Sequence, residues 1–288
     1  MDGKYVPIAE ARIPITDWGF LRSDVTYDAV HVWRGSFFRL EDHLARFGRS
    51  VAALRMDTGH GPEATKEILH ECVRLSGLRD ALVEMGCTRG TGPPGSRDPR
   101  EFTNRFFAFA VPFVWIAKPE KQLEGLHLTI STVRRIPPES VDPKVKNFHW
   151  GDLIRGLYDA YQRGGETAVL VDQAGNVTEG PGFNVFMVRG GRVSTPARGI
   201  LEGITRLTVI ELCAEAGIPL EETLVHADAL RGADEVFLSS TAGGILPVTT
   251  VDGKSLGDGA PGPLTMRLRE LYWSKKEAGW HGTLVEYH

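Results

Sequence analysis

The sequence predicts a mixed α/β protein built from two domains. Strands and amphipathic helices are interspersed along all 288 residues, and they lack the regular strand–helix alternation of a doubly wound parallel sheet. Near the middle of the chain, residues 118–125 (KPEKQLEG) are polar and contain a proline, which predicts a linker. We therefore expect an N-terminal α/β domain at 1–117 and a C-terminal domain at 126–288, each long enough for its own core.

The first half is predicted to begin with a β-hairpin and a helix. Residues 29–39 alternate around a turn at Arg34-Gly35, which is typical of a hairpin. Residues 40–56 then carry apolar side chains at helical spacing. Two strands rich in apolar residues follow, at 81–88 and 105–116.

The second half is predicted to mix strands and helices in the same way. Apolar residues at helical spacing predict one helix near Trp150 and another at 203–217. A hairpin is predicted about Gly190-Gly191. The remaining predicted strands are 126–132, 167–172 and 234–240.

The composition argues against several classes of function. A hydrophobic content of 42% and a charged content of 24% are typical of globular proteins, and a net charge of −4 gives no reason to expect nucleic-acid or membrane partners. The sequence shows no apolar run of membrane-spanning length and no signal peptide. Cys72, Cys87 and Cys213 are odd in number and lack metal-binding spacing, so we expect no metal site and a reducing, cytoplasmic location.

The segment 142–152 (DPKVKNFHWGD) holds two lysines at the edge of an apolar stretch. Lys146 lies between a predicted strand and the helix near Trp150. Desolvation at such a position disfavours the ammonium form and leaves a nucleophilic amine, which a Schiff base with a carbonyl cofactor such as pyridoxal phosphate requires. Most lysines are solvated at the surface, and Lys144 is assigned that role. Taken alone, the residues around Lys146 leave a surface role open for Lys146 as well.

Three further stretches offer groups that such a cofactor needs. Glu179, in NVTEGPGFNVFMV, either pairs with a protonated pyridine nitrogen or simply ends a hairpin. In LEGITRLTV, a helix begins after Gly203, and the outward N–H groups of Ile204 and Thr205 suit a phosphate. In SSTAGGI, small residues after a strand expose Thr241. As isolated motifs, the last two stretches are more often plain helix caps and turns.

In this order and spacing, the motifs KN, TEGPGFN, LEGITR and STAGGI resemble those of the fold-type IV pyridoxal-phosphate enzymes, the class IV aminotransferases. The resemblance covers nearly the whole chain. It implies a two-domain enzyme with its active site in the interdomain cleft, a C-terminal cofactor-binding domain and pyridoxal 5′-phosphate as cofactor. It also implies small-molecule amine and keto-acid substrates and a homodimer or larger assembly.

The resemblance assigns the cofactor contacts residue by residue. Lys146 would hold the cofactor covalently and carry the proton in the chemical step, and Glu179 would pair with the ring nitrogen. Arg46, in HLARF, would bind the cofactor phosphate, a contact that suits a guanidinium; its alternative is a solvated helix charge. The other phosphate contacts would come from Ile204, Thr205 and Thr241.

Within the family, FLRSDVTYDAVHVW, VKNFHWGDL and TVRRIPPESVDP are similar to (R)-selective amine transaminases and D-amino-acid aminotransferases. Branched-chain enzymes carry a GGNY run where this chain has NFHWGD. We therefore expect a transaminase that moves an amino group between an (R)-amine or D-amino acid and a keto acid such as pyruvate. The resemblance implies that the substrate contacts Arg22, Tyr27, Leu82, Glu84, Arg97, Trp150 and Ala242.

The chain also departs from the family pattern. Arg22 stands where many relatives have a histidine, and Leu82 where an aromatic residue is frequent. The family's carboxylate-binding arginine has no match in place, so Arg22, Arg89 and Arg97 all stay candidates for that role. Glu84, in contrast, disfavours a pocket dedicated to acids. Two alternatives therefore stay open: a branched-chain L-amino-acid aminotransferase, and a lyase of the aminodeoxychorismate type.

Overall fold

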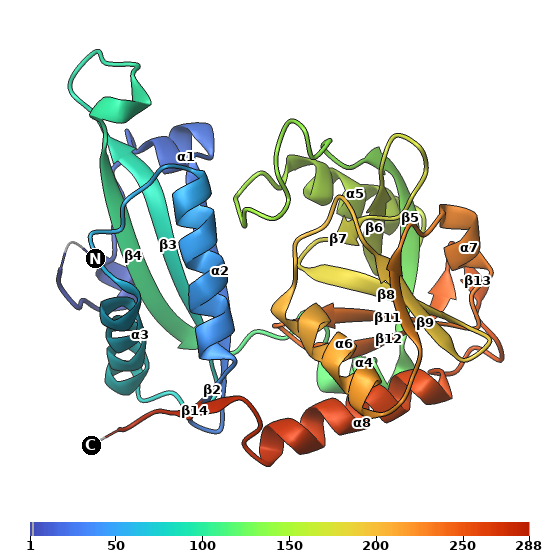
Figure 1. Ribbon diagram of the computed structural model, residues 1–288. Helices are drawn as coiled ribbons and strands as arrows, with labels where there is room; N and C mark the ends of the chain where they lie inside the picture. The colour runs from blue at the N-terminus through green and yellow to red at the C-terminus, as the bar shows by residue number, and fades with distance from the viewer. Residues whose placement is uncertain (2, 288) are drawn as a thin grey trace. The chain divides into compact units, whose positions relative to one another are not determined.

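Two β-sheets, each with its own helices, make up the computed structural model, which describes residue 1 and residues 3–287 (Figure 1). The first unit contains Met1–Val114, Val145–His149 and the chain from Gly279 onward. The second unit contains Trp115–Lys144 and Trp150–Ala278. Helices and strands are mixed in both units, which confirms the predicted fold class.

The first unit is built on an antiparallel sheet. Its described residues form five strands in the order β14-β2-β1-β3-β4. The strands are β1 (Val25–Trp33), β2 (Ser36–Phe38), β3 (Ala81–Thr91), β4 (Thr103–Pro112) and β14 (Gly282–Leu284). The helices are α1 (Trp18–Arg22), α2 (Leu40–Ala53) and α3 (Pro62–Ser76), with short 3-10 turns at Ile8–Glu10 and Pro99–Glu101.

The predicted hairpin and the predicted helix after it are both confirmed. The chain turns between β1 and β2 at Arg34 and Gly35, whose φ angles are 50° and 79°. Leu40, Leu44 and Phe47 of α2 are buried, and their spacing places them on one helical face. Helices α2 and α3 pack against strands of this sheet and share its apolar core (Figure 1).

The second unit is built on a mixed sheet. Its described residues form nine strands, seven in the order β10-β9-β8-β11-β12-β5-β6, with β13 beside β12 and β7 beside β8. The strands are β5 (Leu126–Arg134), β6 (Thr167–Val171), β7 (Glu179–Gly180), β8 (Phe183–Arg189), β9 (Arg192–Pro196), β10 (Leu220–Thr223), β11 (Glu235–Ser240), β12 (Gly244–Val251) and β13 (Lys254–Ser255). The helices are α4 (Pro119–Glu124), α5 (Gly151–Gln162), α6 (Ile204–Glu215), α7 (Ala227–Arg231) and α8 (Pro263–Glu277).

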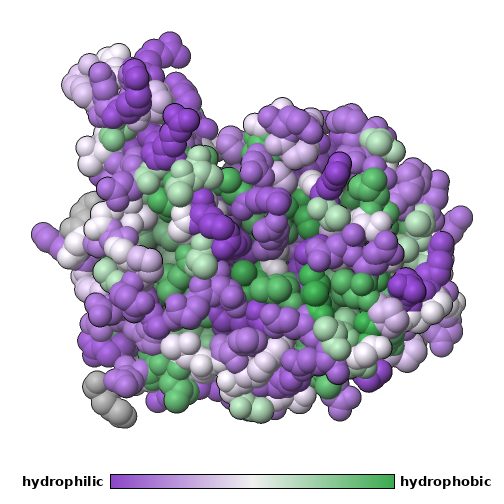
Figure 2. Space-filling model, in the orientation of Figure 1, coloured by the Kyte–Doolittle hydropathy of each residue, from purple (hydrophilic) through white to green (hydrophobic). Residues whose placement is uncertain are grey.

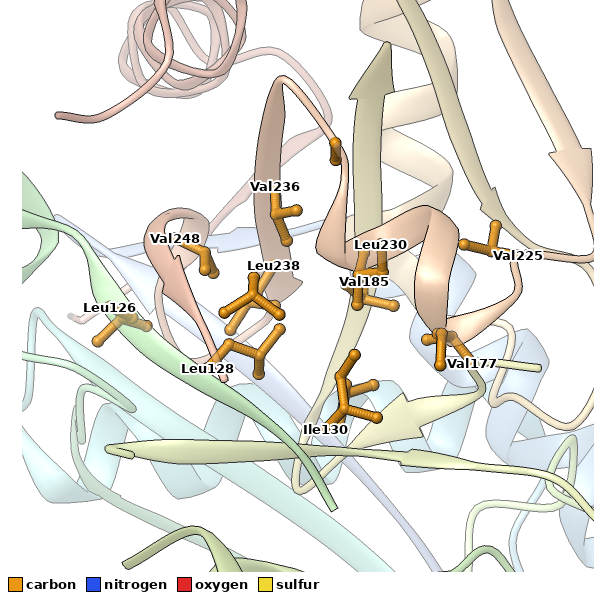
Figure 3. Packing of buried hydrophobic residues seen from close by; sticks show 14 of the residues in the cluster. Leu126, Leu128, Ile130, Val177, Val185, Val225, Leu230, Val236, Leu238 and Val248 are labelled. Atoms are coloured by element: carbon orange, nitrogen blue, oxygen red, sulfur yellow. The ribbon is translucent and has the colours of Figure 1, made fainter. Parts of the chain in front are cut away.

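A core of aliphatic side chains holds the second unit together. Leu128 of β5, Val185 of β8 and Leu238 of β11 point into this core, and Leu230 of α7 closes it (Figure 3). Burying such a side chain contributes about 1.5–3 kcal/mol. The core therefore gives a rigid frame to the strand ends and turns around it. No helix among the described residues is long and apolar enough to cross a membrane.

Residues 118–125, expected to form a linker, instead hold helix α4 within the second unit. Pro119 lies in the first helical turn, where its missing N–H loses no hydrogen bond, so here a proline begins a helix. Gly125, with a φ of 87°, ends it. The end of the expected second domain, 126–288, also differs. The chain from Gly279 onward belongs to the first unit, where β14 pairs with β2.

Candidate active site

Lys146 lies at the edge of β1 in the first unit. Its carbonyl oxygen accepts hydrogen bonds from the N–H of Tyr27 (3.1 Å) and from Thr26 Oγ1 (2.7 Å). Its own N–H donates to Ser50 Oγ at 3.3 Å. The Lys146 Nζ atom lies 4.1 Å from the centroid of the Tyr27 ring. The backbone contacts therefore hold an amine against the face of an aromatic ring.

The sheet face that carries Tyr27 is lined by further aromatic rings and by an acid. Directly opposed residues of antiparallel strands share a face, so Gly86 and the diagonal neighbour Glu84 lie on the same face as Tyr27. On β4, Phe107 lies opposite Gly86 and Phe109 opposite Glu84. A Cβ atom at position 86 would lie 2.3 Å from the Phe107 ring, so this close approach requires glycine. We call these residues the aromatic face.

Glu84 is a partly buried carboxyl whose ionisation is disfavoured. Burial raises the pKa of Glu84 to about 7; the charge of Lys146 opposes this shift and the charge of Asp28 adds to it. At neutral pH, a substantial fraction of this carboxyl is therefore protonated.

We expect Glu84→Gln to change how stability depends on pH. The folded state raises the pKa of Glu84, so the stability linked to the protonated form is present at low pH and is lost as the pH rises through about 7. Glutamine stays neutral, so the variant should gain roughly 1–3 kcal/mol over the wild type between pH 5 and pH 8. Urea unfolding of the cofactor-free proteins measures this gain, and a difference that stays constant over that range contradicts the assignment.

Arg46 is buried behind β1 and is not a solvated helix charge. Its Nε and Nη2 atoms each donate to an oxygen of Asp28 at 2.8 Å, and His43 Nδ1 lies 2.7 Å from Asp28 Oδ1. His43 and Arg46 are three residues apart on α2 and so project from one face of the helix. Burial alone would raise the pKa of Asp28, but the charge of Arg46 and the hydrogen bonds from Arg46 and His43 hold it well below its usual range. Burial lowers the pKa of His43, so Arg46 is the lasting positive charge beside Asp28. The ionised Asp28 therefore orients the guanidinium.

Arg89 is engaged by its own unit and is not placed to hold a substrate carboxylate. Its Nε and Nη2 atoms donate to the carboxylate of Asp24 at 2.8 and 3.2 Å. Its Nη1 and Nη2 atoms donate to the carbonyl oxygens of Arg55 (3.2 Å) and Leu54 (2.7 Å). This guanidinium therefore ties β3 to the loops around it.

Arg22 and Arg97, the other two arginines considered for a carboxylate, are both exposed. The guanidinium of Arg22 lies 5.9 Å from the Trp18 ring within α1. Arg97 lies in the loop between β3 and β4, whose surface is mostly hydrophilic at the upper left of the view (Figure 2). Neither position resembles a buried, pre-oriented carboxylate site.

Glu179 is buried at the start of β7 in the second unit. One of its oxygens accepts from Arg135 Nη2 at 3.0 Å, and the other accepts from the N–H of Leu201 at 2.7 Å. Arg135 Nη1 donates to Asp152 Oδ2 at 2.7 Å, and the same oxygen accepts from the N–H of Ile136 at 2.8 Å. These contacts orient the carboxylate of Glu179 and place a cation beside it.

Helix α6 begins in the second unit without a side-chain cap. Gly203 is its N-cap residue, and Ile204 and Thr205 form the start of the first turn. A Cβ atom at position 203 would lie 2.1 Å from Asn184 Oδ1, so this approach also requires glycine. The first N–H groups of a helix and the positive end of its dipole attract anions. This helix start therefore suits a phosphate group.

Thr241 and Ala242 form the turn that follows β11. The N–H of Ala242 donates to Ser240 Oγ at 3.1 Å, and Ser240 Oγ donates to the carbonyl oxygen of Gly182 at 2.8 Å. A Cβ atom on Gly182 would lie 3.7 Å from the Trp150 ring. Within the second unit, the start of this turn and Trp150 therefore both lie beside Gly182, which follows Glu179 closely in the chain.

Groups elsewhere have structural or surface roles. Lys144 has a side chain that is 65% exposed, and its Nζ atom lies 2.8 Å from Glu202, as expected for a surface lysine. The cysteines at 72, 87 and 213 are all free. Within the part of the chain that the structure describes, no group of three or more His, Cys, Asp or Glu residues could hold a metal ion.

Four buried residues in the contacts around Arg46 and Glu179 were not predicted from the sequence: Asp28, His43, Arg135 and Asp152. A signal existed for the first two, because an acidic residue in an apolar strand is followed by a helix with histidine and arginine at i and i+3. Arg135 and Asp152 carry no comparable local signal, since their pairing depends on how β5 and α5 meet.

Comparison with known proteins points to one family. The model of the family described as amino-transferase class IV matches residues 26–251. A putative branched-chain-amino-acid aminotransferase of Methanocaldococcus jannaschii is 32% identical over 275 residues, 94% of each chain. A D-alanine aminotransferase of Bacillus licheniformis is 33% identical over 272 residues, 93% of each chain. The crystal structure of branched-chain amino acid aminotransferase from Thermobaculum terrenum in its PLP form (holo form) has a TM-score of 0.88 at 29% identity, covering 98% of this chain and 96% of that one.

Proposed function

This chain belongs to the class IV aminotransferase family, and from that premise we propose that it moves an amino group between an (R)-amine or D-amino acid and a keto acid such as pyruvate. The enzyme is an aminotransferase with pyridoxal 5′-phosphate as its cofactor. When bound, the cofactor supplies an aldehyde that bonds to amines and a ring that withdraws electrons from the neighbouring carbon.

The described residues fit this cofactor. Lys146 presents an amine over an aromatic ring, and Arg46 presents a guanidinium oriented by Asp28. Helix α6 begins with N–H groups that suit a phosphate. Glu179 is a buried carboxylate beside a cation, which suits a protonated pyridine nitrogen. The donor set is therefore the one that an aldehyde, a phosphate and a pyridine ring require.

We infer a role for each of these residues. The Nζ atom of Lys146 would hold the cofactor through its aldehyde and, as a free amine, would move a proton at the donor carbon. Glu179 holds a proton at the ring nitrogen. Arg46 and the backbone of Ile204 and Thr205 bind the phosphate.

The proposed donor class rests on the aromatic face beneath Lys146. Tyr27, Phe107 and Phe109 offer surface that suits a phenyl or alkyl substituent. Glu84 places a carboxyl on the same face, and the ionised form of this carboxyl attracts a cationic amine and repels a donor carboxylate. The identity to the D-alanine aminotransferase supports small D-amino acids as further donors.

We expect (R)-1-phenylethylamine to convert the bound cofactor faster than its (S)-enantiomer, with D-alanine also active. Because Lys146 moves the proton from one side, the two enantiomers of a donor with unequal substituents should react at different rates. Stopped-flow absorbance of the bound cofactor, with each amine and with L-leucine, measures these rates. Faster conversion by L-leucine than by both (R)-1-phenylethylamine and D-alanine would contradict the proposal.

A branched-chain L-amino-acid aminotransferase is the second candidate. It is favoured by the identity to the Methanocaldococcus jannaschii protein and by the similarity to the Thermobaculum terrenum structure. In that case Arg22 or Arg97 would hold the donor carboxylate, and replacing that arginine by alanine should raise the KM for L-leucine. A lyase of the aminodeoxychorismate type would instead release pyruvate without any amino acceptor, which a lactate dehydrogenase-coupled assay detects.

We expect Arg46→Ala to weaken cofactor retention far more than it slows the chemical step. Losing a charged phosphate contact should weaken pyridoxal phosphate binding about ten- to hundredfold, and should leave binding of pyridoxal, which has no phosphate, nearly unchanged. The variant also leaves the Asp28 carboxylate buried without its guanidinium, which should lower the unfolding free energy by about 3–5 kcal/mol.

The double variant Asp28→Asn/Arg46→Gln separates these two effects. It removes both charges, so it should recover much of the lost stability without recovering phosphate affinity. Equilibrium dialysis and urea unfolding measure the two quantities. A double variant that binds pyridoxal phosphate as tightly as the wild type rules out Arg46 as a phosphate ligand.

We also propose that the enzyme is a homodimer. Large apolar side chains are exposed in both units, including Phe20 (70%) in the first and Tyr158 (65%) and Tyr161 (56%) in the second. Exposed apolar side chains that lie close together often mark protein interfaces. Light scattering at assay concentration should give twice the mass of the chain, and a monomer that is fully active contradicts this proposal.

A further inference from the structure

Arg135 joins two buried carboxylates in the second unit. Its Nη2 atom donates to Glu179 at 3.0 Å and its Nη1 atom to Asp152 at 2.7 Å. The three side chains are each 9% exposed or less. Together they carry one positive and two negative charges. A protonated ring nitrogen beside Glu179 would balance this excess negative charge.

Each member of this group is held by its own backbone element. Arg135 directly follows β5, and its N–H donates to the carbonyl oxygen of Val171 at the end of β6, at 3.0 Å. Asp152 lies in the first turn of α5, where the helix dipole stabilises its charge. Glu179 begins β7 and accepts from the N–H of Leu201. The distances among the three side chains are therefore set by the backbone positions of β5, α5 and β7.

Stability alone does not explain such an arrangement. Buried ion pairs add little net stability, because desolvation of the charges offsets their attraction. Burial alone would lower the pKa of Arg135, but the charges of Glu179 and Asp152 raise it, so the guanidinium stays charged. The group thus keeps a permanent cation between two carboxylates, one of which has the proposed role at the cofactor.

We propose that Arg135 and Asp152 are positioning residues that together set the proton affinity of the pair formed by Glu179 and the pyridine nitrogen. This inference rests on the proposed function. Arg135 orients Glu179 and favours its ionised form, so the shared proton stays on the nitrogen. Asp152 offsets the charge of Arg135, so that the cation does not drive the proton off the nitrogen.

The two residues therefore act in opposite directions. Arg135→Gln removes a positive charge, so the pair of Glu179 and ring nitrogen should lose its proton at a higher pH than in the wild type. Asp152→Asn removes a negative charge but keeps an oxygen for Arg135 and for the N–H of Ile136, so the pair should lose its proton at a lower pH. Charges at such distances shift proton affinities by about one pH unit or more. A role limited to packing gives no reason for opposite signs.

The test follows the ring nitrogen directly. Holoenzymes reconstituted with cofactor labelled with ¹⁵N at the ring are titrated by NMR as the wild type, Arg135→Gln, Arg135→Lys and Asp152→Asn. We expect a midpoint near that of the wild type for Arg135→Lys, a higher one for Arg135→Gln and a lower one for Asp152→Asn. If Arg135→Gln does not fold, the isosteric Asp152→Asn variant still decides the direction.

An unchanged midpoint in Asp152→Asn overturns the inference, as do shifts of the same sign in Asp152→Asn and Arg135→Gln. A failure of the proposed function is distinct, because it shows in the wild type as absent cofactor binding or absent amino transfer. A wild type that binds the cofactor and transfers amino groups, with variants that do not shift as described, refutes only the role of Arg135 and Asp152.

Discussion

Lys146→Ala should abolish amino transfer, with a loss of roughly 10⁴-fold or more. Alanine offers no nucleophile to bind the cofactor aldehyde and no amine to move the proton from the donor carbon. The fold should survive, because the hydrogen bonds of residue 146 to Tyr27, Thr26 and Ser50 all use its backbone. Steady-state rates with (R)-1-phenylethylamine and pyruvate, together with a thermal unfolding curve, measure both expectations.

Lys144→Ala is the matched control, because that lysine lies two positions away and has an exposed side chain beside Glu202. It should keep nearly full activity. Lys146→Arg provides a second control: it retains a positive charge but lacks a nucleophilic amine, so it should be as inactive as the alanine variant. Substantial activity in either Lys146 variant contradicts the assigned role.

Glu179→Gln should lower kcat by about 10²-fold or more, while the Kd for pyridoxal phosphate changes far less. Glutamine keeps the shape of the side chain and an oxygen that can accept from the N–H of Leu201 or from Arg135. It removes the charge that holds a proton at the ring nitrogen, so the ring withdraws electrons less strongly in the chemical step. Single-turnover rates with saturating cofactor isolate this effect.

The expected phenotype of Glu179→Gln is the reverse of that of Arg46→Ala. The first variant should bind the cofactor and react slowly, whereas the second should lose the cofactor and, at saturating cofactor, react at a rate closer to that of the wild type. Both residues are buried and charged, so a general loss of stability would affect them alike. If the two phenotypes were exchanged, the roles given to Glu179 and Arg46 would be wrong even within the right family.

Elements with a local signal were predictable from the sequence. The hairpin at Arg34-Gly35 and the apolar stripe of α2 depend on neighbouring residues alone. Helix α8 lies outside the predicted elements, because its buried face does not follow an apolar pattern. Lys276 is buried there, with its Nζ atom 4.9 Å from the Trp273 ring. A charged residue in such a place is indistinguishable from a surface residue in the sequence.

The same limit applies to the candidate site. Lys146 and Glu179 stand in motifs that can be recognised locally. Their surroundings depend on pairing between distant segments: Arg135 reaches Glu179 across 44 residues. The sequence does not state which buried cation meets which carboxylate, because that depends on where β5, α5 and β7 come together. Pro119 was interpreted as part of a linker, but it lies in the first turn of α4. A proline interrupts a helix in its interior and is tolerated at its start, so its effect depends on a helix boundary that the local sequence does not fix.

Reduction of the holoenzyme with borohydride tests the central claim most directly. Borohydride makes the bond between a lysine amine and the cofactor permanent, and peptide mapping by mass spectrometry then locates the modified residue. We expect the phosphopyridoxyl group on Lys146, with none on Lys144 and none on any peptide of the Lys146→Ala variant. Labelling of another lysine in the wild type, or of none in a protein that transfers amino groups, would contradict the account.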